Sequence, residues 1–205
     1  LSIGLGSGIV ADSNGDDEWR ECLAKGRFAN VDVNAQDGHK VDLIETMAFE
    51  PASGIARLEA HLERMKTSAA ALQFEFDRHA ARNAIQAITF HQDSPAMVRL
   101  HLGQSGALAI ELKPMPAPHD GPGVHPIFVD ADGFVTEGVI WNVFVERDGV
   151  LLTPKLARGV LPGVLRAELL ESGQAVEADL RAEDLAGGFL VGNSVRGLVR
   201  GEVVV

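Results

Sequence analysis

The sequence predicts an α+β fold, with a small N-terminal α/β layer followed by a β-rich C-terminal part. Over residues 58–72, apolar residues recur with the 3.6-residue spacing of an amphipathic helix. From residue 127 onward, short runs rich in β-branched and aromatic residues alternate with Gly and Asp turns, which is typical of short strands. The sequence contains no internal repeat and no low-complexity tract. Its 205 residues therefore suit one domain or two small ones.

The charge balance and the cysteine content limit the partners and the compartment. The net charge is −11, from 29 acidic and 18 basic residues, which argues against nucleic acid and anionic membranes as partners. Cys22 is the single cysteine, so no internal disulfide can form, and we expect a reducing cytoplasm. The sequence has neither a long apolar run nor the basic start of a signal peptide.

The N-terminal part begins with a glycine-rich strand and turn over residues 1–13. A short helix over 16–25 has acids at its start and Lys25 at its end, as the helix dipole favours. The chain does not start with methionine, so we expect it to begin inside a longer polypeptide. Residues 30–38 are polar and resemble a linker, and a strand follows over 41–49.

A second group of elements completes the small layer. The helix over 58–72 is followed by another over 78–88, and then by a hairpin whose strands span 97–102 and 107–112. Residues 114–126 hold five prolines and two glycines, so this stretch is predicted to be irregular.

The C-terminal part is predicted to contain five short strands and one longer helix. That helix spans 162–171, with a proline near its first turn, and a helical turn follows at 182–185. The strands are expected at 127–129, 134–135, 141–145, 150–152 and 189–191.

Two features of the C-terminal part could carry chemistry. Glu137 is predicted to lie in an otherwise apolar strand, and a carboxylate in such a strand must be paired or hydrogen-bonded. It is either a strand-edge acid or a functional group. The run Leu161-Pro-Gly-Val-Leu-Arg166 places a glycine bend before a helix, whose free amides can bind an anion. An ordinary helix start is the alternative.

Three further groups of residues are candidate site residues because of their places in the predicted elements. His61 and Arg64 are three residues apart on one helix and share a face, which is either solvated or functional. Arg99 and His101 alternate on one strand and therefore also share a face, where they are either a surface pair or ligands of a substrate carboxylate. The stretch Gly192-Asn-Ser194 closes a strand, as an ordinary turn would.

Together, Glu137 with its flanking residues, Thr153-Pro154 and the glycine bend before Val164 resemble the class IV aminotransferase family of pyridoxal phosphate enzymes, also called fold type IV. The resemblance covers about four-fifths of the chain. It implies that Glu137 contacts the ring nitrogen of pyridoxal phosphate, and that dimers form with the site near their interface. The phosphate would be bound by Arg64, Val164, Leu165, Asn193 and Ser194, and substrate-side candidates are Thr46 as a catalytic residue with His61, Arg99 and His101.

The first 28 residues resemble a different family, the C-terminal end of chorismate-binding synthases. There, acids matching Glu18 and Glu21 lie at a Mg²⁺ site, but one carboxylate pair cannot complete an octahedral site, so we expect no metal. A synthase end joined to a class IV domain resembles bifunctional p-aminobenzoate synthases. The expected division is a synthase remnant (1–28), a linker (29–40), a small α/β subdomain (41–118) and a β-rich cofactor-binding subdomain (119–205).

This order, with Asn193 where other branches have Thr, is similar to the 4-amino-4-deoxychorismate lyase branch. That branch releases pyruvate to form p-aminobenzoate, a folate precursor. A class IV transaminase acting on branched-chain or D-amino acids is the alternative. The resemblance therefore implies a small-molecule substrate, either aminodeoxychorismate or an amino acid.

The Schiff-base lysine that the family uses to hold the cofactor is not found. The chain has five lysines, and the family's lysine lies further upstream of Glu137 than Lys113 does. The segment that would carry it is missing near residues 114–126, through deletion or through omission from the printed sequence. A third reading is therefore a non-catalytic remnant.

Overall fold

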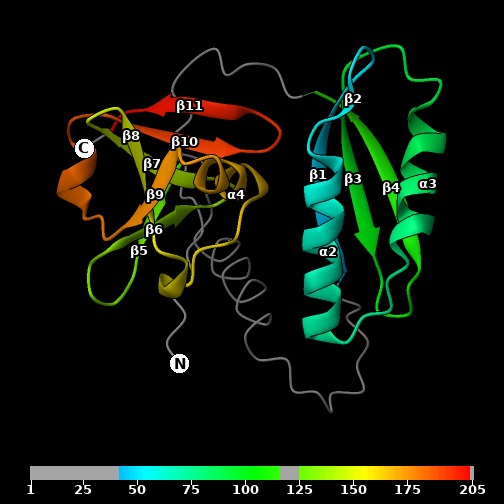
Figure 1. Cartoon of the computed structure of the whole chain (residues 1–205), viewed down its shortest axis with the longest axis horizontal. Helices are drawn as coiled ribbons and strands as arrows, with labels where there is room; N and C mark the ends of the chain where they lie inside the picture. The colour runs from blue at the N-terminus through cyan, green and yellow to red at the C-terminus, as the bar shows by residue number, and fades with distance from the viewer. Residues whose placement is uncertain (1–41, 116–124, 204–205) are drawn as a thin grey trace, which may run out of the picture.

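The computed structural model describes residues 42–115 and 125–203, which form two parts, each built around one antiparallel sheet core (Figure 1). The predicted synthase remnant, the linker and most of the proline-rich stretch lie outside the described residues.

The first part is a four-stranded antiparallel sheet in the order β2-β1-β3-β4, with two helices on one face (Figure 1). Alternate residues of β1 and β3 point to the helices, as the period of two in a strand requires. The helices bury this face in a core that includes Met47, Leu62, Ile85 and Leu100. The elements are β1 (Leu43–Glu50), β2 (Gly54–Ile55), α2 (Leu58–Leu72), α3 (Arg78–Thr89), β3 (Ala96–Leu102) and β4 (Leu108–Pro114).

The second part is strand-rich. Its main sheet has the order β11-β10-β7-β6-β5, and β7 also pairs with β8, which in turn pairs in parallel with β9. One core cluster is centred on Val143 and Leu180, and another joins Phe144 to the helix α4. The elements are β5 (Ile127–Val129), β6 (Val135–Gly138), β7 (Asn142–Arg147), β8 (Val150–Pro154), α4 (Val164–Glu171), β9 (Ala175–Ala178), β10 (Phe189–Asn193) and β11 (Gly197–Gly201), with short 3₁₀ turns η1 (Leu156–Arg158) and η2 (Ala182–Leu185).

Several elements differ from the sequence-based expectation. Helix α4 begins at Val164 and not at residue 162, because Gly163 keeps an extended backbone with ψ 140°. Strands β2, β9 and β11 were not predicted, and Glu137 lies in a strand of four residues, Val-Thr-Glu-Gly, that is not apolar throughout.

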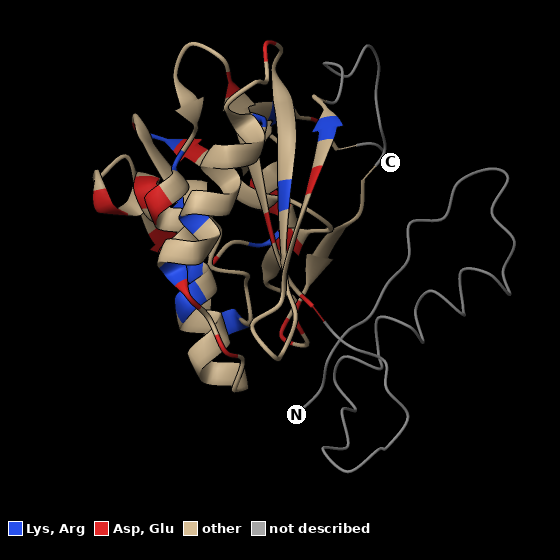
Figure 2. Ribbon diagram, turned by 90° about the vertical axis from the view of Figure 1, so that its right-hand side faces the viewer, with Lys and Arg blue, Asp and Glu red and all other residues tan. Residues whose placement is uncertain are grey.

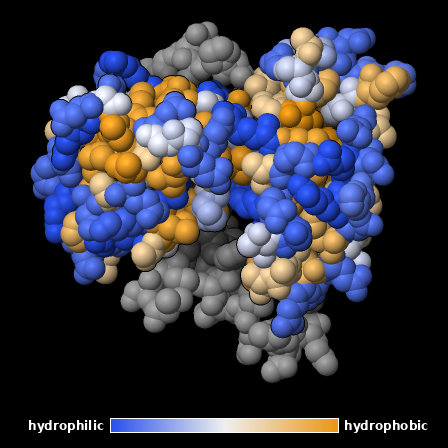
Figure 3. Space-filling model, viewed as in Figure 1, coloured by the Kyte–Doolittle hydropathy of each residue, from blue (hydrophilic) through white to orange (hydrophobic). Residues whose placement is uncertain are grey.

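Charged and hydrophobic residues are intermixed in the views that Figures 2 and 3 give. Acidic and basic residues are interspersed along the described helices and strands (Figure 2). On the face shown in Figure 3, hydrophobic residues gather on both parts between polar ones. Among the described residues, no helix is long and apolar enough to cross a membrane.

Candidate cofactor site

Glu137 lies half-buried on β6, next to the loop that leads into α4. The backbone N–H of Leu161 donates to Glu137 Oε2 at 2.9 Å. Burial raises the pKa of Glu137 above its ordinary value, and the hydrogen bond from Leu161 offsets only part of that rise. A positively charged N–H group beside this carboxyl would favour its ionised form.

The start of α4 is held by Asn142, the first residue of β7. The buried Asn142 side chain donates from Nδ2 to the carbonyl of Leu161 at 3.1 Å. A Cβ on Gly163 would lie only 1.9 Å from Asn142 Oδ1, so glycine is required for this close approach. Helix geometry leaves the amides of Val164 and Leu165 without acceptors inside the helix. The first turn of α4 thus offers donors within the loop that also contacts Glu137.

Arg64, on α2, reaches this loop from the other part of the molecule. Its Nη1 donates to the carbonyl of Pro162 at 3.2 Å, just before α4 begins. Its Nε and Nη2 donate to the two oxygens of Glu45, at 2.8 and 2.6 Å. The guanidinium is therefore fixed beside the α4 start by a carboxylate of β1.

His61 and Ser194 meet across the same junction. His61 is buried on α2, with Nδ1 2.6 Å from Glu45 Oε2 and Nε2 2.8 Å from the hydroxyl oxygen of Ser194. Ser194 follows β10 in the other part, and its hydroxyl also lies 3.4 Å from the carbonyl of Thr46. The structure thus brings together His61, Arg64, Ser194 and the start of α4.

Asn193 is used mainly to shape its own turn. Its Oδ1 accepts from the backbone N–H groups of Val195 and Arg196, at 3.0 and 2.9 Å, and its Nδ2 donates to the carbonyl of Ile140 at 3.2 Å. Its side chain therefore fixes the β10–β11 turn that presents Ser194.

The remaining predicted site residues lie on the other face of the first sheet. Thr46 is directly opposite Arg99 in the β1–β3 register, and His101 is two residues further along β3. Arg99 forms an ion pair with Glu111 at 3.9 Å, and His101 Nδ1 lies 3.9 Å from Asp42. These side chains face away from α2, whereas Glu45 faces His61 and Arg64.

Sequence reasoning missed Glu45. The signal was present, because Glu45 alternates with Met47 and Phe49, and these three residues share the face of β1 that packs on the helices. An acid at a core-facing strand position needs a partner. Only the fold shows that the partners are the two polar residues of α2.

No described lysine bonds to these groups. Each of the three points to a surface acid and is substantially exposed: Lys66 with Glu63 at 3.3 Å, Lys113 with Glu111 at 3.1 Å, and Lys155 with Asp179 at 2.6 Å. Lys25 and Lys40 lie outside the described residues.

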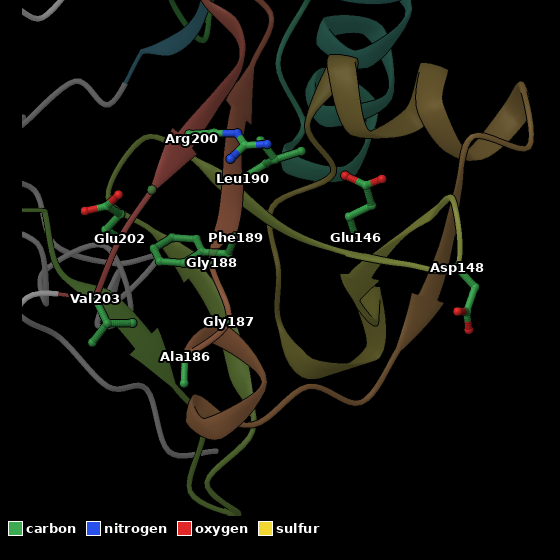
Figure 4. Close-up of a pocket in the computed structure, with 11 residues that line it drawn as sticks. Glu146, Asp148, Ala186, Gly187, Gly188, Phe189, Leu190, Arg200, Glu202 and Val203 are labelled. Atoms are coloured by element: carbon green, nitrogen blue, oxygen red, sulfur yellow. The ribbon is translucent and has the colours of Figure 1, made fainter.

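A separate cavity of about 670 Å³ lies at the β10 and β11 ends (Figure 4). It is lined by Glu146, Asp148 and Glu202 against the single basic residue Arg200, and none of the predicted site residues lines it. This acidic lining does not suit a phosphate.

Known proteins resemble this chain over most of the described residues. A putative aminodeoxychorismate lyase of the fission yeast Schizosaccharomyces pombe is 26% identical over 215 positions, which cover 80% of this chain and 90% of the relative. That alignment is longer than the whole chain of 205 residues, so the relative has residues with no counterpart here.

Two solved structures share the fold. A putative amino-acid aminotransferase from Mesorhizobium loti has a TM-score of 0.74 at 30% identity, covering 80% of this chain and 99% of that one. The 4-amino-4-deoxychorismate lyase of Pseudomonas aeruginosa has a TM-score of 0.64 at 21% identity, covering 79% of this chain and 82% of that one. The predicted mixed α+β architecture of fold type IV is confirmed.

The family model described as amino-transferase class IV matches residues 42–121 and 119–202. The two matches overlap at residues 119–121, within the proline-rich stretch where we expect the lysine segment to be missing. Since they span nearly all the described residues, the chain belongs to the class IV aminotransferase family, which depends on pyridoxal phosphate.

Proposed function

We propose that the described residues form the pyridoxal phosphate site of a protein of the 4-amino-4-deoxychorismate lyase branch. The observation that carries the proposal is the convergence of Arg64, Ser194 and the first turn of α4, beside the loop that contacts Glu137. The identity to the fission yeast relative supports the choice of branch.

The phosphate side of this site fits the cofactor. Arg64 has five N–H donors, of which three are used by Glu45 and Pro162, so one remains on each terminal nitrogen. The amides of Val164 and Leu165 add donors at a helix N-terminus, where the dipole also favours an anion. The negative charge of Glu45 is compensated by Arg64, so it does not repel a phosphate strongly.

The ring side fits as well. When bound, pyridoxal phosphate acts as an electron sink, and an acid at its ring nitrogen keeps that nitrogen protonated. Glu137 would fill this role, because a protonated ring nitrogen would stabilise the carboxylate that burial disfavours.

The covalent anchor does not fit. The described lysines form ion pairs with acidic residues at the surface, and none contacts Glu137, Arg64 or the start of α4. The residues present would therefore bind and orient the cofactor without supplying the amine that holds it. Release of pyruvate from 4-amino-4-deoxychorismate to give p-aminobenzoate remains the proposed reaction of this branch, and it requires such a lysine.

Thr46, His61, Arg99 and His101 remain proposals for the substrate side. The same holds for the homodimer, the cytoplasmic location, the four-part division of the chain and the bifunctional synthase context.

Two other functions are each favoured by one observation. The placement of the described lysines favours a non-catalytic remnant that binds the cofactor without a covalent bond. The 30% identity to the Mesorhizobium loti protein, which is named a putative aminotransferase, favours a transaminase.

One set of measurements on the full-length protein distinguishes these three functions. The protein is titrated with pyridoxal phosphate, reduced with borohydride and weighed by intact mass spectrometry. Arg64→Gln is the test variant, and Arg82→Gln, a partly exposed residue that pairs with Glu59 away from the site, is its control. We expect saturable binding that Arg64→Gln weakens and Arg82→Gln leaves unchanged. The absence of saturable binding by the wild type would overturn the cofactor site.

The products then assign the function. A reduced lysine adduct together with p-aminobenzoate formed from 4-amino-4-deoxychorismate supports the lyase. Binding without an adduct or a product supports the remnant, and glutamate-dependent amino transfer supports the transaminase.

A further inference from the structure

We propose that Glu45 is the positioning residue of the phosphate site: it holds Arg64 directly, and Ser194 through His61, in the arrangement that receives the phosphate. The inference rests on the proposed cofactor site and deepens it, since both oxygens of Glu45 are bonded to Arg64 and His61 and would act on the ligand through them. Three observations carry it, namely the burial of Glu45, its bonds to Arg64 and the chain of hydrogen bonds through His61.

Burying the Glu45 carboxylate costs desolvation free energy, which only its hydrogen-bonded partners can offset. The residue is 3% exposed, and its neighbours on the same strand face, Met47 and Phe49, are core residues. Removing a carboxylate from water costs several kcal/mol, and a well-packed apolar residue in its place is often neutral or stabilising. Stability of the core therefore does not account for an acid at this position, whereas the orientation of its partners does.

Glu45 and Arg64 form a bidentate carboxylate–guanidinium pair. Nε donates to one oxygen of Glu45 and Nη2 to the other, at 2.8 and 2.6 Å, which fixes the plane of the guanidinium as well as its position. The third bond, from Nη1 to the carbonyl of Pro162, places the group beside the first turn of α4. Without Glu45, the long side chain of Arg64 would lose two of its three fixed contacts.

His61 extends the same constraint to the other part of the molecule. Burial raises the pKa of Glu45, but hydrogen bonds from His61 and Arg64 outweigh it and leave that pKa below its ordinary value, so Glu45 is a carboxylate at neutral pH. A carboxylate only accepts, so His61 carries a proton on Nδ1 and presents Nε2 to Ser194 at 2.8 Å. Both Glu45 and His61 are almost completely buried, which keeps water from competing.

Glu45 therefore ties together groups from two different sheets. Arg64 and His61 lie on α2, over the first sheet, and Ser194 lies in the β10–β11 turn of the second. A phosphate contacted by both Arg64 and Ser194 would depend on this one carboxylate for the position of each. Groups that orient direct ligands in this way are typically important for affinity although they do not touch the ligand.

The test compares ligands with and without phosphate. Dissociation constants for pyridoxal phosphate and for pyridoxal are measured on the full-length wild type and on Glu45→Gln, which keeps the size of the side chain but removes its charge. We expect the affinity for pyridoxal phosphate to fall on the order of 10-fold, by analogy with residues that orient the ligands of a metal ion, while that for pyridoxal stays unchanged. Glu50→Gln, at the exposed end of the same strand, should change neither.

The experiment distinguishes a failure of the proposed function from a failure of the positioning role of Glu45. If the wild type does not bind pyridoxal phosphate, the proposed function itself is wrong. If the wild type binds and Glu45→Gln binds both ligands as the wild type does, or loses both equally while remaining folded, the positioning role is wrong.

A second variant covers the case in which Glu45→Gln does not fold. Ser194→Ala changes a partly exposed turn and removes the last link of the chain. It should selectively weaken the binding of pyridoxal phosphate, and an unchanged affinity would overturn the link through His61.

Discussion

Replacing Gly163 by alanine tests the packing that places the start of α4. The backbone at Gly163 has φ −64° and ψ 140°, which alanine adopts without strain. The obstacle is steric, because the new Cβ would lie 1.9 Å from Asn142 Oδ1 and 3.1 Å from its Cγ. Asn142 is buried and bonded to the carbonyl of Leu161, so it cannot turn aside and keep that bond.

The expected magnitude follows from these two effects. Overpacking a well-packed site costs about 1–3 kcal/mol. Displacing Asn142 leaves a buried amide group without its partner, which costs about 1–3 kcal/mol more. We therefore expect Gly163→Ala to lower the free energy of unfolding by about 2–6 kcal/mol.

The same change should be nearly harmless once Asn142 is alanine. No side-chain oxygen then stands in the way, and the entropy that alanine removes from the unfolded chain offsets its weaker capping of a helix. We expect a residual effect within about 1 kcal/mol of zero.

Urea unfolding of the wild type, both single variants and the double variant gives the coupling energy. We expect about 2 kcal/mol or more between the two positions. Gly187→Ala is the control, since its Cβ would meet nothing within 4 Å and should change the stability by less than about 1 kcal/mol. If Gly163→Ala is equally costly with and without the Asn142 side chain, the clash is not the cause and the reasoning fails.

Three further predictions concern stability. Gln73 ends α2 with φ 60°, so Gln73→Gly should stabilise the fold by about 1 kcal/mol; a lower melting temperature would contradict this. Phe144 is fully buried between β7 and α4, and Phe144→Ala should cost about 3–5 kcal/mol. In the same urea assay, the 79% exposed Phe90 should tolerate alanine within about 0.5 kcal/mol, and similar losses at both sites would refute the assigned core. Finally, the two site carboxyls should show opposite pH dependence, measured as the stability difference between the wild type and each glutamine variant. The raised pKa of Glu137 means that the wild type loses stability relative to Glu137→Gln as the pH rises through that pKa. The lowered pKa of Glu45 means that the wild-type advantage over Glu45→Gln is present above the ordinary value of 4.5 and is lost as the pH falls through the lowered pKa. Parallel curves for the two pairs would show that the assigned environments are wrong.

Local patterns predicted the elements that depend on local interactions. The helix over 58–72 has the predicted bounds, because its apolar residues recur at helical spacing. Of these, Leu62, Met65 and Ala69 are buried, whereas Leu72 at the C-terminal end is 51% exposed. The turn at 182–185 and the strand at 127–129 also have the predicted bounds. The resemblance to class IV aminotransferases rested on the order of short motifs, and the family match confirms it.

Elements that depend on distant partners were missed. The strand β9, Ala-Val-Glu-Ala, has a weak pattern of its own and forms because β8 lies parallel to it. The strand β11 begins and ends with glycine, a pattern that predicts a loop. Its pairing with β10 makes it a strand.

The sequence by itself determined the α+β class and the family, since periodicity and motif order are properties of the chain alone. That the family's lysine segment is missing stays a prediction from the sequence. Only the tertiary structure decided which residues meet: it joined Glu45 to Arg64 and His61, and His61 to Ser194, which lies 133 positions further along the chain. The physical reason is that a buried carboxylate takes whichever donors the fold places within hydrogen-bond distance, and no local pattern encodes that distance.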